Sequence, residues 1–515
     1  MITTLPTLGL ADGDPAEQAV DAVVIGVYSQ DADAPAPLLL AAGAESVAVA
    51  FDGRLVETLV LLGATGAVGE VTKLATLGAI TAPMVVAVGL GPEPAGALPP
   101  TETLRRAAGA ATRALAGTGS ALVALPVAEE PEREVDTVRA VAEGALIGGY
   151  RFAGYKTTPN ARKAPVGRVA VHVPDAADKV AKAEAKRAPV VARAVARARD
   201  WVNTPPNELR PPDFADAIAK AGDAAGLDVE VLDERALKRG GYGGILAVGM
   251  GSAAPPRLVR IGYAPRGARR HVALVGKGVT FDTGGYAVKP AHGMWEMKSD
   301  MAGAAAVASV VLAVAGLKPK VAVTGYLPIA ENMISGSAYR PGDVITMYNG
   351  LKVEVLNPDA EGRLILGDAI ARACEDEPDY LLETSTLTGG QVVALGKRVA
   401  GVMGTPELCA RVQEAGERVG EPAWPMPMPD DVRKGMDSDV ADISQTNANM
   451  DRAGHMLQGG IFLSQFVADD LPWAHVDIAG PSYHSGEPTG YWSKGGTGVP
   501  VRTFLELIDR IAADG

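Results

Sequence analysis

The first 165 residues alternate between short apolar runs and longer segments with helical periodicity. The apolar runs have the length of strands and lie at residues 22–27, 84–88 and 121–126. The helical segments lie at residues 102–115 and 135–146. Strands that alternate with helices in this way favour an α/β layer. We therefore predict an N-terminal α/β domain over residues 1–174.

Residues 175–201 are rich in alanine, lysine and arginine and predict one exposed helix that connects two domains. Pro189 lies inside this segment. Because proline lacks a backbone N–H and its ring clashes with the preceding turn, we expect the helix to be kinked or broken there. A basic helix can also bind nucleic acid, but a solvated helix face explains these residues more simply.

Residues 202–515 again alternate between strand-like and helix-like runs, and a last helix is predicted at 503–511. This pattern favours a mixed sheet that helices cover on both faces. The predicted fold class is therefore α/β, with a smaller N-terminal α/β domain and a larger C-terminal domain whose mixed sheet is flanked by helices.

Acidic residues cluster in two turns of the C-terminal part, and each turn follows an apolar, strand-like run. The first follows the run at 271–275, and the second lies between a run at 353–356 and a helix that begins near Leu364. The carboxylates in these turns are Asp282, Asp300, Asp359 and Glu361. In open α/β sheets, ligands bind beyond the carboxyl ends of strands, where such turns gather. The four carboxylates can therefore share one pocket.

Crowded carboxylates repel one another, and a folded chain tolerates them when a cation lies among them. For the turn around Asp359 taken alone, a solvated surface loop is the alternative. Four carboxylates carry more negative charge than one divalent ion needs. They suit a pair of ions, which in hydrolases lie about 3.5–4 Å apart and share a bridging water.

Several ordered motifs surround these carboxylates. The octapeptide Asn-Pro-Asp-Ala-Glu-Gly-Arg-Leu occupies residues 357–364. The other motifs are Lys277-Gly278 with Asp282, Lys289-Pro290, 300–303, 331–333, 340–343, 386–389 and 477–480. In order and spacing, this set resembles the leucine aminopeptidases, a family of cytosolic, hexameric exopeptidases with two metal ions. The resemblance is strong from about residue 200 to the C-terminus and weak before it.

The resemblance implies metal ligands at Lys277, Asp282, Asp300, Asp359 and Glu361. Asp282 and Glu361 would bridge two divalent ions, Zn or Mn, with Mg or Co as alternatives. Lys277 and Asp300 would complete one site, and Asp359 would hold the other ion. Most lysines are solvated ammonium groups, but an amine can lose its proton beside a divalent cation. Lys277 lies between two glycines at the end of a strand-like run, which favours the ligand interpretation.

Lys289 and Arg363 are the two catalytic residues that the resemblance implies. Lys289 would stay charged and stabilise the oxyanion of the tetrahedral intermediate. Arg363 would anchor a bicarbonate ion that acts as the general base. None of the six histidines lies in either acidic cluster, so a base from outside the chain is plausible. The alternative for Arg363 is an ion pair with Asp359 or Glu361.

The implied function is that of a leucyl aminopeptidase, a metal-dependent hydrolase that acts through a bridging hydroxide held by two metals. It would release N-terminal residues, preferably leucine and other apolar residues, from peptides. The implied substrate-binding residues are Lys289, Met297, Asn357, Thr386 and Gly389. The resemblance also implies a macrodomain-like N-terminal domain, a cytoplasmic homohexamer and a role in peptide catabolism.

Two features depart from the family pattern. Pro358 replaces the threonine that is usual in the octapeptide. Proline fixes φ and biases the preceding residue toward an extended conformation, so we expect a stiffer turn that still presents its carboxylates. Tyr286 and Trp295 are bulkier than expected between the two clusters, and they either narrow the mouth of the pocket or simply pack.

Length and composition agree with this interpretation. A chain of 515 residues is too long for one core and predicts two or more domains. Hydrophobic residues form 47% of the chain, which suits a globular protein. The net charge of −13 argues against general affinity for nucleic acid, which needs a basic face.

The chain shows no sign of export or membrane insertion in its sequence. Its two cysteines, Cys374 and Cys409, cannot form a disulfide framework, which favours a reducing cytosol. The N-terminus lacks a basic region followed by an apolar core, so no signal peptide is expected. No uncharged apolar stretch of about 18 residues occurs, so no membrane span is expected.

Two other functions remain to be weighed. A two-metal phosphoesterase would use nearly the same ligands, but basic groups for a phosphate are scarce beyond Lys289 and Arg363. A DNA-binding or architectural role would need a basic stripe, and none is evident in the N-terminal domain. Three histidines near the C-terminus are expected to be structural rather than catalytic: His455, His475 and His484.

Overall fold

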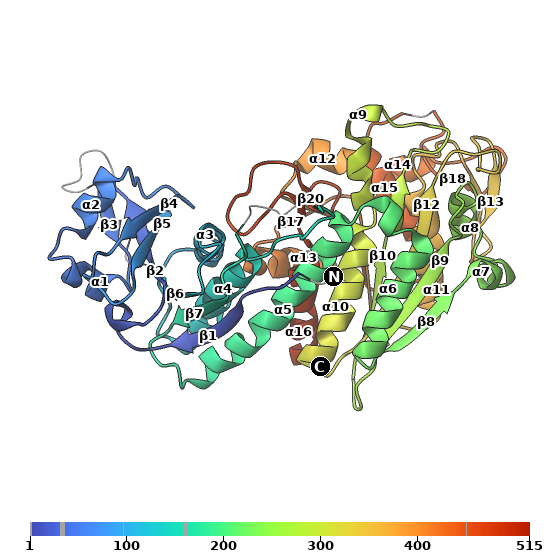
Figure 1. Cartoon of the computed structure of the whole chain (residues 1–515). Helices are drawn as coiled ribbons and strands as arrows, with labels where there is room; N and C mark the ends of the chain where they lie inside the picture. Colours follow the sequence, from blue (N-terminus) through green and yellow to red (C-terminus); the bar gives the residue numbers. More distant parts are fainter. Residues whose placement is uncertain (1–2, 31–36, 96, 158–162, 450, 515) are drawn as a thin grey trace. The chain divides into compact units, whose positions relative to one another are not determined.

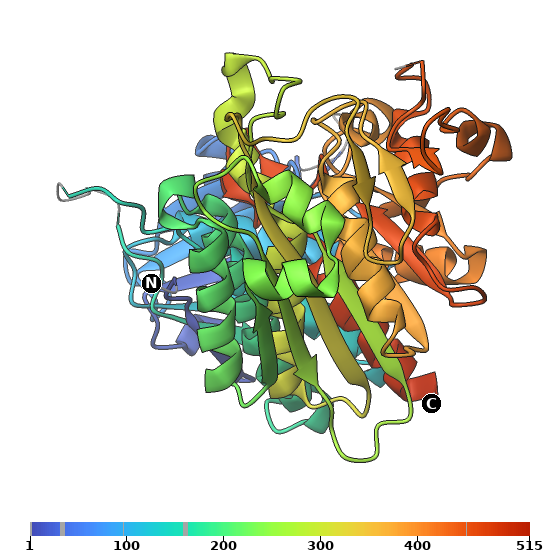
Figure 2. The same cartoon turned by 90° about the vertical axis from the view of Figure 1, so that its right-hand side faces the viewer.

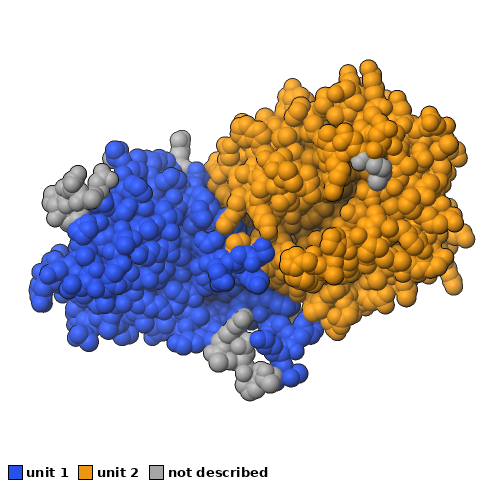
Figure 3. All heavy atoms as spheres, turned by 90° about the horizontal axis from the view of Figure 1, so that it is seen from above, with its two compact units in different colours: residues 1–196, 485–494 blue, residues 197–484, 495–515 orange. Residues whose placement is uncertain are grey.

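The computed structural model describes residues 3–30, 37–95, 97–157, 163–449 and 451–514 (Figure 1). The chain divides into two compact units, coloured separately in Figure 3. Unit 1 contains Met1–Ala196 and Ser485–Lys494, and unit 2 contains Arg197–His484 and Gly495–Gly515. The mixed α/β fold with a smaller N-terminal part and a larger C-terminal part confirms the predicted fold class.

Unit 1 is built on a seven-stranded sheet in the order β1-β7-β6-β2-β5-β4, with β3 paired to β2. The strands are β1 Thr7–Ala11, β2 Ala22–Ser29, β3 Leu38–Leu40, β4 Val71–Ala75, β5 Met84–Pro92, β6 Ser120–Ala124 and β7 Arg168–His172. Only β3 and β4 run antiparallel to their neighbours. The central strands are buried on both faces, which explains why they read as continuous apolar runs.

The helices of unit 1 follow the predicted alternation with strands. They are η1 Pro15–Glu17, α1 Glu45–Ala50, α2 Leu55–Leu61, α3 Thr101–Ala114 and α4 Pro131–Gly148. Helices α3 and α4 pack at close range, because a Cβ on Gly144 would lie 2.1 Å from the Arg105 carbonyl oxygen. A glycine in α4 therefore sets the distance between the two helices.

The predicted connecting helix is α5, Lys179–Asn203. It runs through Pro189 without a break, although the sequence suggested a kink or a break there. The prediction that this helix is exposed is wrong, because its alanine and valine side chains are largely buried. The boundary between the two units falls inside α5, after Ala196.

A segment near the C-terminus, 485–494, belongs to unit 1 although both flanking stretches belong to unit 2. The segment connects two short strands of unit 2, β20 Tyr483–His484 and β21 Gly495–Gly496, which pair with each other. Within unit 1, the Tyr491 hydroxyl donates to Glu102 Oε1 at 2.9 Å. A Cβ on Gly109 of α3 would lie 2.6 Å from the Tyr491 Cβ. No pattern in the sequence predicts that this segment packs on unit 1.

Tyr491→Ala is expected to lower the free energy of unfolding by about 3 kcal/mol, because it removes a buried aromatic side chain that packs against α3. Tyr491→Phe keeps the ring, removes the hydroxyl that donates to Glu102, and is expected to cost about 1 kcal/mol. Urea unfolding of the full chain, followed by circular dichroism, measures both effects. Equal stability of wild type and Tyr491→Ala would contradict the packing described here.

Unit 2 contains a nine-stranded mixed sheet in the order β17-β16-β19-β15-β10-β12-β9-β8, with β11 paired to β12. Its strands are β8 Asp228–Leu232, β9 Arg257–Tyr263, β10 His271–Gly276, β11 Gly278–Asp282, β12 Ala322–Asn332, β15 Tyr380–Ser385, β16 Ala400–Gly404, β17 Ala423–Pro425 and β19 Trp473–Asp477. A three-stranded sheet lies beside it, formed by β13 Val344–Thr346, β14 Lys352–Glu354 and β18 Ile443–Ser444. Strands β12, β10, β15 and β19 are parallel to one another, so their carboxyl ends meet at one edge.

Helices cover both faces of this sheet (Figures 1 and 2). The helices of unit 2 are η2 Pro206–Glu208, α6 Pro211–Ala224, α7 Glu234–Gly240, α8 Gly243–Gly249, α9 Ala291–Met294, η3 Trp295–Ser299, α10 Ala302–Leu317, α11 Gly362–Cys374, α12 Gly389–Leu395, α13 Pro406–Val419, α14 Asp430–Lys434, α15 His455–Ser464 and α16 Val501–Asp514. Side chains of α8, α11 and α15 share one hydrophobic core with β10, β12 and β15.

Helix α10 belongs to the buried interior of unit 2. The helical segment Ala291–Leu317 is long and apolar enough to cross a membrane by length and composition alone, with a mean hydropathy of 1.9. However, 83% of its most apolar window is buried inside the protein. Helix α10 therefore has the surroundings of a core helix.

Asp368 fixes α11 to its neighbours from within the core. Its side chain is fully buried and accepts hydrogen bonds from the backbone N–H of Ile245 at 2.9 Å and of Tyr348 at 2.8 Å. Burial raises the pKa of Asp368 to about 7, although the backbone N–H groups favour the charged form. The helix that begins at the octapeptide is thus held in place by a carboxyl group.

The raised pKa predicts a pH-dependent contribution of Asp368 to stability. The folded state binds this proton more tightly than the unfolded state, whose value is near 3.8. The contribution is therefore fully present below about pH 4 and is lost as the pH rises toward 7. We expect wild type to lose stability relative to Asp368→Asn across this window, measured by urea unfolding at several pH values. A difference between the two proteins that does not change with pH would contradict this.

Candidate metal centre and active site

The two acidic turns lie together in unit 2, although they follow strands of different sheets. Lys277 follows β10, at the carboxyl end where ligands bind in open α/β sheets, and Asp282 ends β11, which pairs with β12. Asp300 follows η3. Asp359 and Glu361 lie in the turn between β14 of the three-stranded sheet and α11. The structure therefore brings all five predicted metal ligands to one region.

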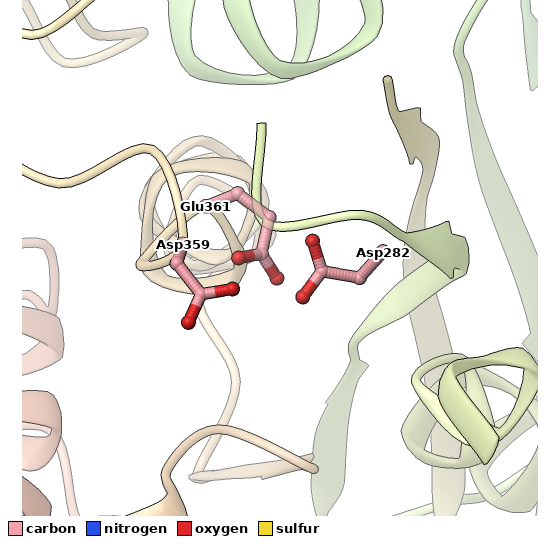
Figure 4. Close-up of side chains that lie close together, drawn as sticks. All are labelled: Asp282, Asp359 and Glu361. Carbon is pink, nitrogen blue, oxygen red and sulfur yellow. The ribbon is translucent and has the colours of Figure 1, made fainter. Parts of the chain in front are cut away.

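Three of the carboxylates converge closely. Oxygens of Asp282, Asp359 and Glu361 all lie within 4.8 Å of one another, and Figure 4 shows the three side chains converging. Asp282 and Glu361 are buried, whereas the Asp359 side chain is 30% exposed. The cluster is thus enclosed at Asp282 and Glu361 and reached by solvent at Asp359.

Lys277 lies between two of the carboxylates. Its Nζ is 2.8 Å from Asp300 Oδ1 and 2.9 Å from Glu361 Oε1, and it also donates to the Thr386 carbonyl at 3.2 Å. The side chain is only 3% exposed, so it is not a solvated surface lysine. Burial opposes its charge, but the carboxylates, Asp300 first, outweigh burial and raise the pKa of Lys277. Gly362 leaves room for it, because a Cβ there would lie 2.5 Å from Lys277 Cε.

Lys289 approaches the cluster from the side of Asp359. Its Nζ is 2.8 Å from Asp282 Oδ2 and 2.6 Å from Asp359 Oδ1. Burial disfavours its charge, but these carboxylates and Glu361 outweigh burial and raise the pKa of Lys289 well above its usual range. The side chain remains a cation within reach of anything bound between Asp282 and Asp359.

Asn332 positions Asp282 and the octapeptide turn together, a role that the sequence did not reveal. It pairs with Asp282 across β11 and β12, and its Nδ2 donates to Asp282 Oδ1 at 2.8 Å. The same Nδ2 donates to the Pro358 carbonyl at 3.0 Å, and the Tyr339 hydroxyl donates there at 2.8 Å. The motif at 331–333 and the polar residue at the end of an apolar strand were the available signals.

The turn around Pro358 is also held by Gln445, which lies far away in the sequence. Gln445 Oε1 accepts from the Asn357 N–H at 3.0 Å, and Gln445 Nε2 donates to the Ala360 carbonyl at 3.0 Å. Asn357 Oδ1 in turn accepts from the Asp359 N–H at 3.0 Å. With proline in place of the usual threonine, the turn still presents both of its carboxylates to the cluster.

The chemistry of the cluster fits divalent cations. Burial, and then the charge of Glu361, raises the pKa of Asp282 to about 6, and burial also raises the pKa of Asp300. Burial acts in the same direction on Glu361, but Lys277 and Lys289 lower its pKa. Asp300 Oδ2 is buried and has no hydrogen-bond partner in the described part of the chain. Converging carboxylate oxygens with an unpartnered buried oxygen are a suitable donor set for hard divalent ions.

Arg363, the seventh residue of the octapeptide, is buried in the first turn of α11. It is 1% exposed, donates to the Gln445 carbonyl and lies with its guanidinium carbon 6.0 Å from the Phe462 ring centre. It forms no ion pair with Asp359 or Glu361, both of which the structure describes, so the alternative considered above is not observed. Its Nε has no hydrogen-bond partner among the described residues, and burial lowers the pKa of Arg363 to about 10.

A cavity of about 240 Å³ opens at Asp359. Its lining residues are Ala287, Asn357, Asp359, Thr446, Asp451, Arg452, His455 and Gln458. Asn357 is the one predicted substrate-binding residue in this lining. Thr386 instead donates to Asp300 Oδ1 at 2.7 Å, beside Lys277. Gly389 begins α12 with open space where a Cβ would lie, and Met297 is half-buried in η3.

The two bulky residues noted in the sequence do not line this cavity. Tyr286 is 46% exposed and donates from its hydroxyl to the Ser335 carbonyl at 2.8 Å. Trp295 is 59% exposed and lies edge-on to His292. Of the histidines, His455 lines the cavity, which the sequence did not suggest, and His475 is buried against Glu383.

Comparison with known proteins supports the same assignment along almost the whole chain. Residues 196–505 match the cytosol aminopeptidase family, catalytic domain, and residues 24–159 match the N-terminal domain of that family. A probable cytosol aminopeptidase of Streptomyces coelicolor is 51% identical over 512 residues, which cover 96% of each chain. One of Streptomyces griseus is 49% identical over 524 residues, which cover 99% of each chain.

Solved structures agree. The bottromycin maturation enzyme BotP in complex with Mn superposes with a TM-score of 0.82 at 34% identity, covering 96% of this chain and all of that one. A tomato leucine aminopeptidase variant superposes with a TM-score of 0.84 at 28% identity, covering 98% of this chain and 96% of that one. The chain therefore belongs to the cytosol aminopeptidase family, whose members are metal-dependent hydrolases that remove N-terminal residues from peptides.

Proposed function

We propose that this enzyme releases leucine and other apolar residues from the N-termini of peptides. The observation that carries the proposal is the buried cluster in which Asp282, Asp359 and Glu361 converge beside Lys277 and Lys289. A phosphoesterase could use the same carboxylates, but it would need more basic groups than this cluster offers for a phosphate. A lysine among the ligands also favours the aminopeptidase.

The five predicted ligands would hold two divalent ions, Zn or Mn, with Mg or Co as alternatives. Asp282 and Glu361 would contact both ions, Lys277 and Asp300 would complete one site, and Asp359 would hold the other ion. When bound, such ions lower the pKa of a water molecule and polarise a carbonyl group. Lys277 would then bind as the neutral amine, because a divalent cation opposes the ammonium form.

Two cations of the chain would assist the reaction without contacting the ions. Lys289 stays protonated and would hold the oxygen that becomes negatively charged at the scissile carbonyl. Arg363 would anchor a bicarbonate ion as the general base, and its unpartnered Nε supports this role. The part of the chain itself in this step would be to hold the base in place through the Arg363 guanidinium.

Selectivity for the first residue of the peptide is assigned to Met297, Thr386 and Gly389. Because open space lies where a Gly389 Cβ would be, Gly389→Val is expected to fold normally. It would fill space near Thr386 and lower kcat/KM for a leucyl substrate about tenfold more than for an alanyl substrate, which is within the range of hydrophobic pocket effects. Equal losses on both substrates would argue that Gly389 lies outside the pocket.

The requirement for a free amino group tests the proposed reaction directly. Leucyl-p-nitroanilide should be hydrolysed by the metal-loaded enzyme, and its N-acetyl derivative should not, because acetylation removes the amine that binds at the metal centre. Hydrolysis of both at similar rates would identify a general amidase or endopeptidase instead.

The proposal includes the setting in which the enzyme works. We place it in the cytoplasm as a homohexamer that takes part in peptide catabolism, without a membrane or nucleic-acid partner. The names of the relatives as cytosol aminopeptidases support this location. A molar mass from light scattering near six times the 52.9 kDa chain would support the hexamer.

A further inference from the structure

One wall of the cavity at Asp359 comes from a part of the chain that holds no predicted metal ligand. Of the residues in this wall, Thr446 and Gln458 flank a loop that contains Asp451 and Arg452. The loop leads into α15, whose first residue His455 also faces the cavity. This wall adds the guanidinium of Arg452 and the carboxylate of Asp451 to a cavity that also has Asp359 in its lining.

Gln458 holds this loop from within the protein. It is 1% exposed, and its Nε2 donates to the carbonyls of Asp451 at 3.0 Å and Ala453 at 2.9 Å. Its Oε1 accepts from the Asn447 N–H at 3.1 Å. A buried amide that bonds to three points of one loop presents Arg452 from a defined backbone.

Arg452 is exposed, and its guanidinium has no ion-pair or hydrogen-bond partner among the described residues. The neighbouring Asp451 keeps its negative charge but forms no ion pair with Arg452 among the described residues, and its Oδ1 accepts from the Ala453 N–H at 2.9 Å within the loop. Burial together with Arg363 and Arg452 lowers the pKa of His455 to about 4. The wall therefore offers a guanidinium group whose hydrogen-bond donors are not used by the described residues, with one carboxylate and a neutral imidazole nearby.

We propose that Arg452 binds the C-terminal carboxylate of the substrate, so that the enzyme acts preferentially on very short peptides with a free C-terminus. The inference rests on the proposed aminopeptidase function and specifies its substrate class. A short peptide has its amino group at one end and its carboxylate at the other. The cavity offers a place for each end, because its lining contains Asp359 of the metal centre, where the amino group would bind, and the guanidinium of Arg452. Guanidinium groups bind carboxylates through paired, charge-assisted hydrogen bonds.

The size of the cavity agrees with a short substrate. A sphere of its volume of 240 Å³ is about 8 Å across, and two or three extended residues span about 7 to 10 Å. A peptide of this length that places its amino group near Asp359 can place its carboxylate near Arg452. In a longer peptide, an uncharged peptide bond lies where a short peptide has its C-terminal carboxylate. The Arg452 guanidinium then forms no charge-assisted hydrogen bond with the substrate at that position.

The experiment compares leucyl-glycine with leucyl-glycinamide, which differ only in the C-terminal charge, using metal-loaded wild type and Arg452→Gln. Wild type is expected to prefer the free acid about tenfold in kcat/KM, mainly through KM, as for one charge-assisted hydrogen-bonded pair. Arg452→Gln should lose this preference, and Arg452→Lys should keep part of it. Arg239→Gln, at an exposed position of α7, is the matched control and should behave as wild type.

Each outcome decides between the two proposals. Equal kcat/KM of wild type for both peptides, or an unchanged preference in Arg452→Gln, overturns the role of Arg452 and leaves the aminopeptidase function intact. Failure of wild type to release leucine from either peptide and from leucyl-p-nitroanilide overturns the proposed function itself. Loss of the preference in Arg452→Gln with an unchanged kcat on leucyl-p-nitroanilide supports both.

Discussion

Glu361→Gln is expected to abolish metal-dependent turnover, with a loss on the order of 10³-fold or more. Glu361 is buried with an oxygen 2.9 Å from Lys277 Nζ, and its oxygens converge with those of Asp282 and Asp359. Glutamine has the same size and removes only the charge, so the cluster loses one of its anionic oxygens without a cavity. Stabilisation by bound ions is worth several kcal/mol in metallohydrolases, which corresponds to that loss in rate.

The measurement for Glu361→Gln combines turnover with metal content. Kinetics with leucyl-p-nitroanilide give the rate, and elemental analysis after dialysis gives the number of ions per chain, which should fall. Glu230→Gln is the matched control, because Glu230 is exposed on β8, at the edge of the sheet in unit 2. A Glu361→Gln variant with full activity would remove the basis for assigning this cluster as the active site.

Lys289→Met is expected to lower kcat by about 10²–10³-fold, the usual cost of removing one group that stabilises an oxyanion. Lys289 is the cation that touches both Asp282 and Asp359 and is still 22% exposed, so it can reach a bound substrate. Methionine keeps most of the length of the side chain and removes the charge. Because the charge acts on the transition state, KM should change much less than kcat.

Metal content distinguishes this role from a ligand role. Lys289→Met should bind as many ions per chain as wild type, whereas Glu361→Gln should not. Lys320→Met, at an exposed position beyond the end of α10, is the control. A Lys289→Met protein that loses its metal together with its activity would show that Lys289 acts through metal binding rather than on the carbonyl oxygen.

The acidic turns were predictable because two local signals coincide with one rule of topology. Each turn follows an apolar run, and the rule that ligands bind beyond the carboxyl ends of strands was enough to expect a site at both turns. The two runs belong to different sheets, however, because Asp282 ends β11 beside β12 and the turn with Asp359 follows β14 of the three-stranded sheet. That the two turns meet is therefore a result of the folded structure and not of one shared sheet. Similarly, the continuous apolar runs of unit 1 identified β2, β5 and β6, because parallel strands buried on both faces leave no alternation.

Residues that act through distant contacts could not be predicted. Gln445 lies more than 80 residues from the octapeptide whose turn it holds, and only the folded chain brings them together. The same is true of the wall that contains Arg452, since its loop shows neither apolar periodicity nor clustered ligands. Segment 485–494 joins unit 1 through the close packing of Tyr491 on Gly109. A glycine in a helix does not show from the sequence alone which residue will pack against it.

Helix α5 illustrates why composition misled. Its lysines and arginines suggested a solvated helix, but the alanines and valines between them form a buried face. Alanine side chains are small, so they add little to the apolar periodicity of a sequence. They can nevertheless pack closely against neighbouring elements in the folded protein. Pro189 is tolerated inside the helix, although proline removes one backbone hydrogen bond.

The most direct test of the metal-dependent aminopeptidase is leucine release from leucyl-p-nitroanilide by protein stripped with a chelator and then given Mn or Zn. We expect the stripped protein to be inactive, either ion to restore turnover, and full activity to coincide with two ions per chain. Undiminished activity of the stripped protein would contradict this function, as would a folded chain that binds two ions per subunit and remains inactive with every metal.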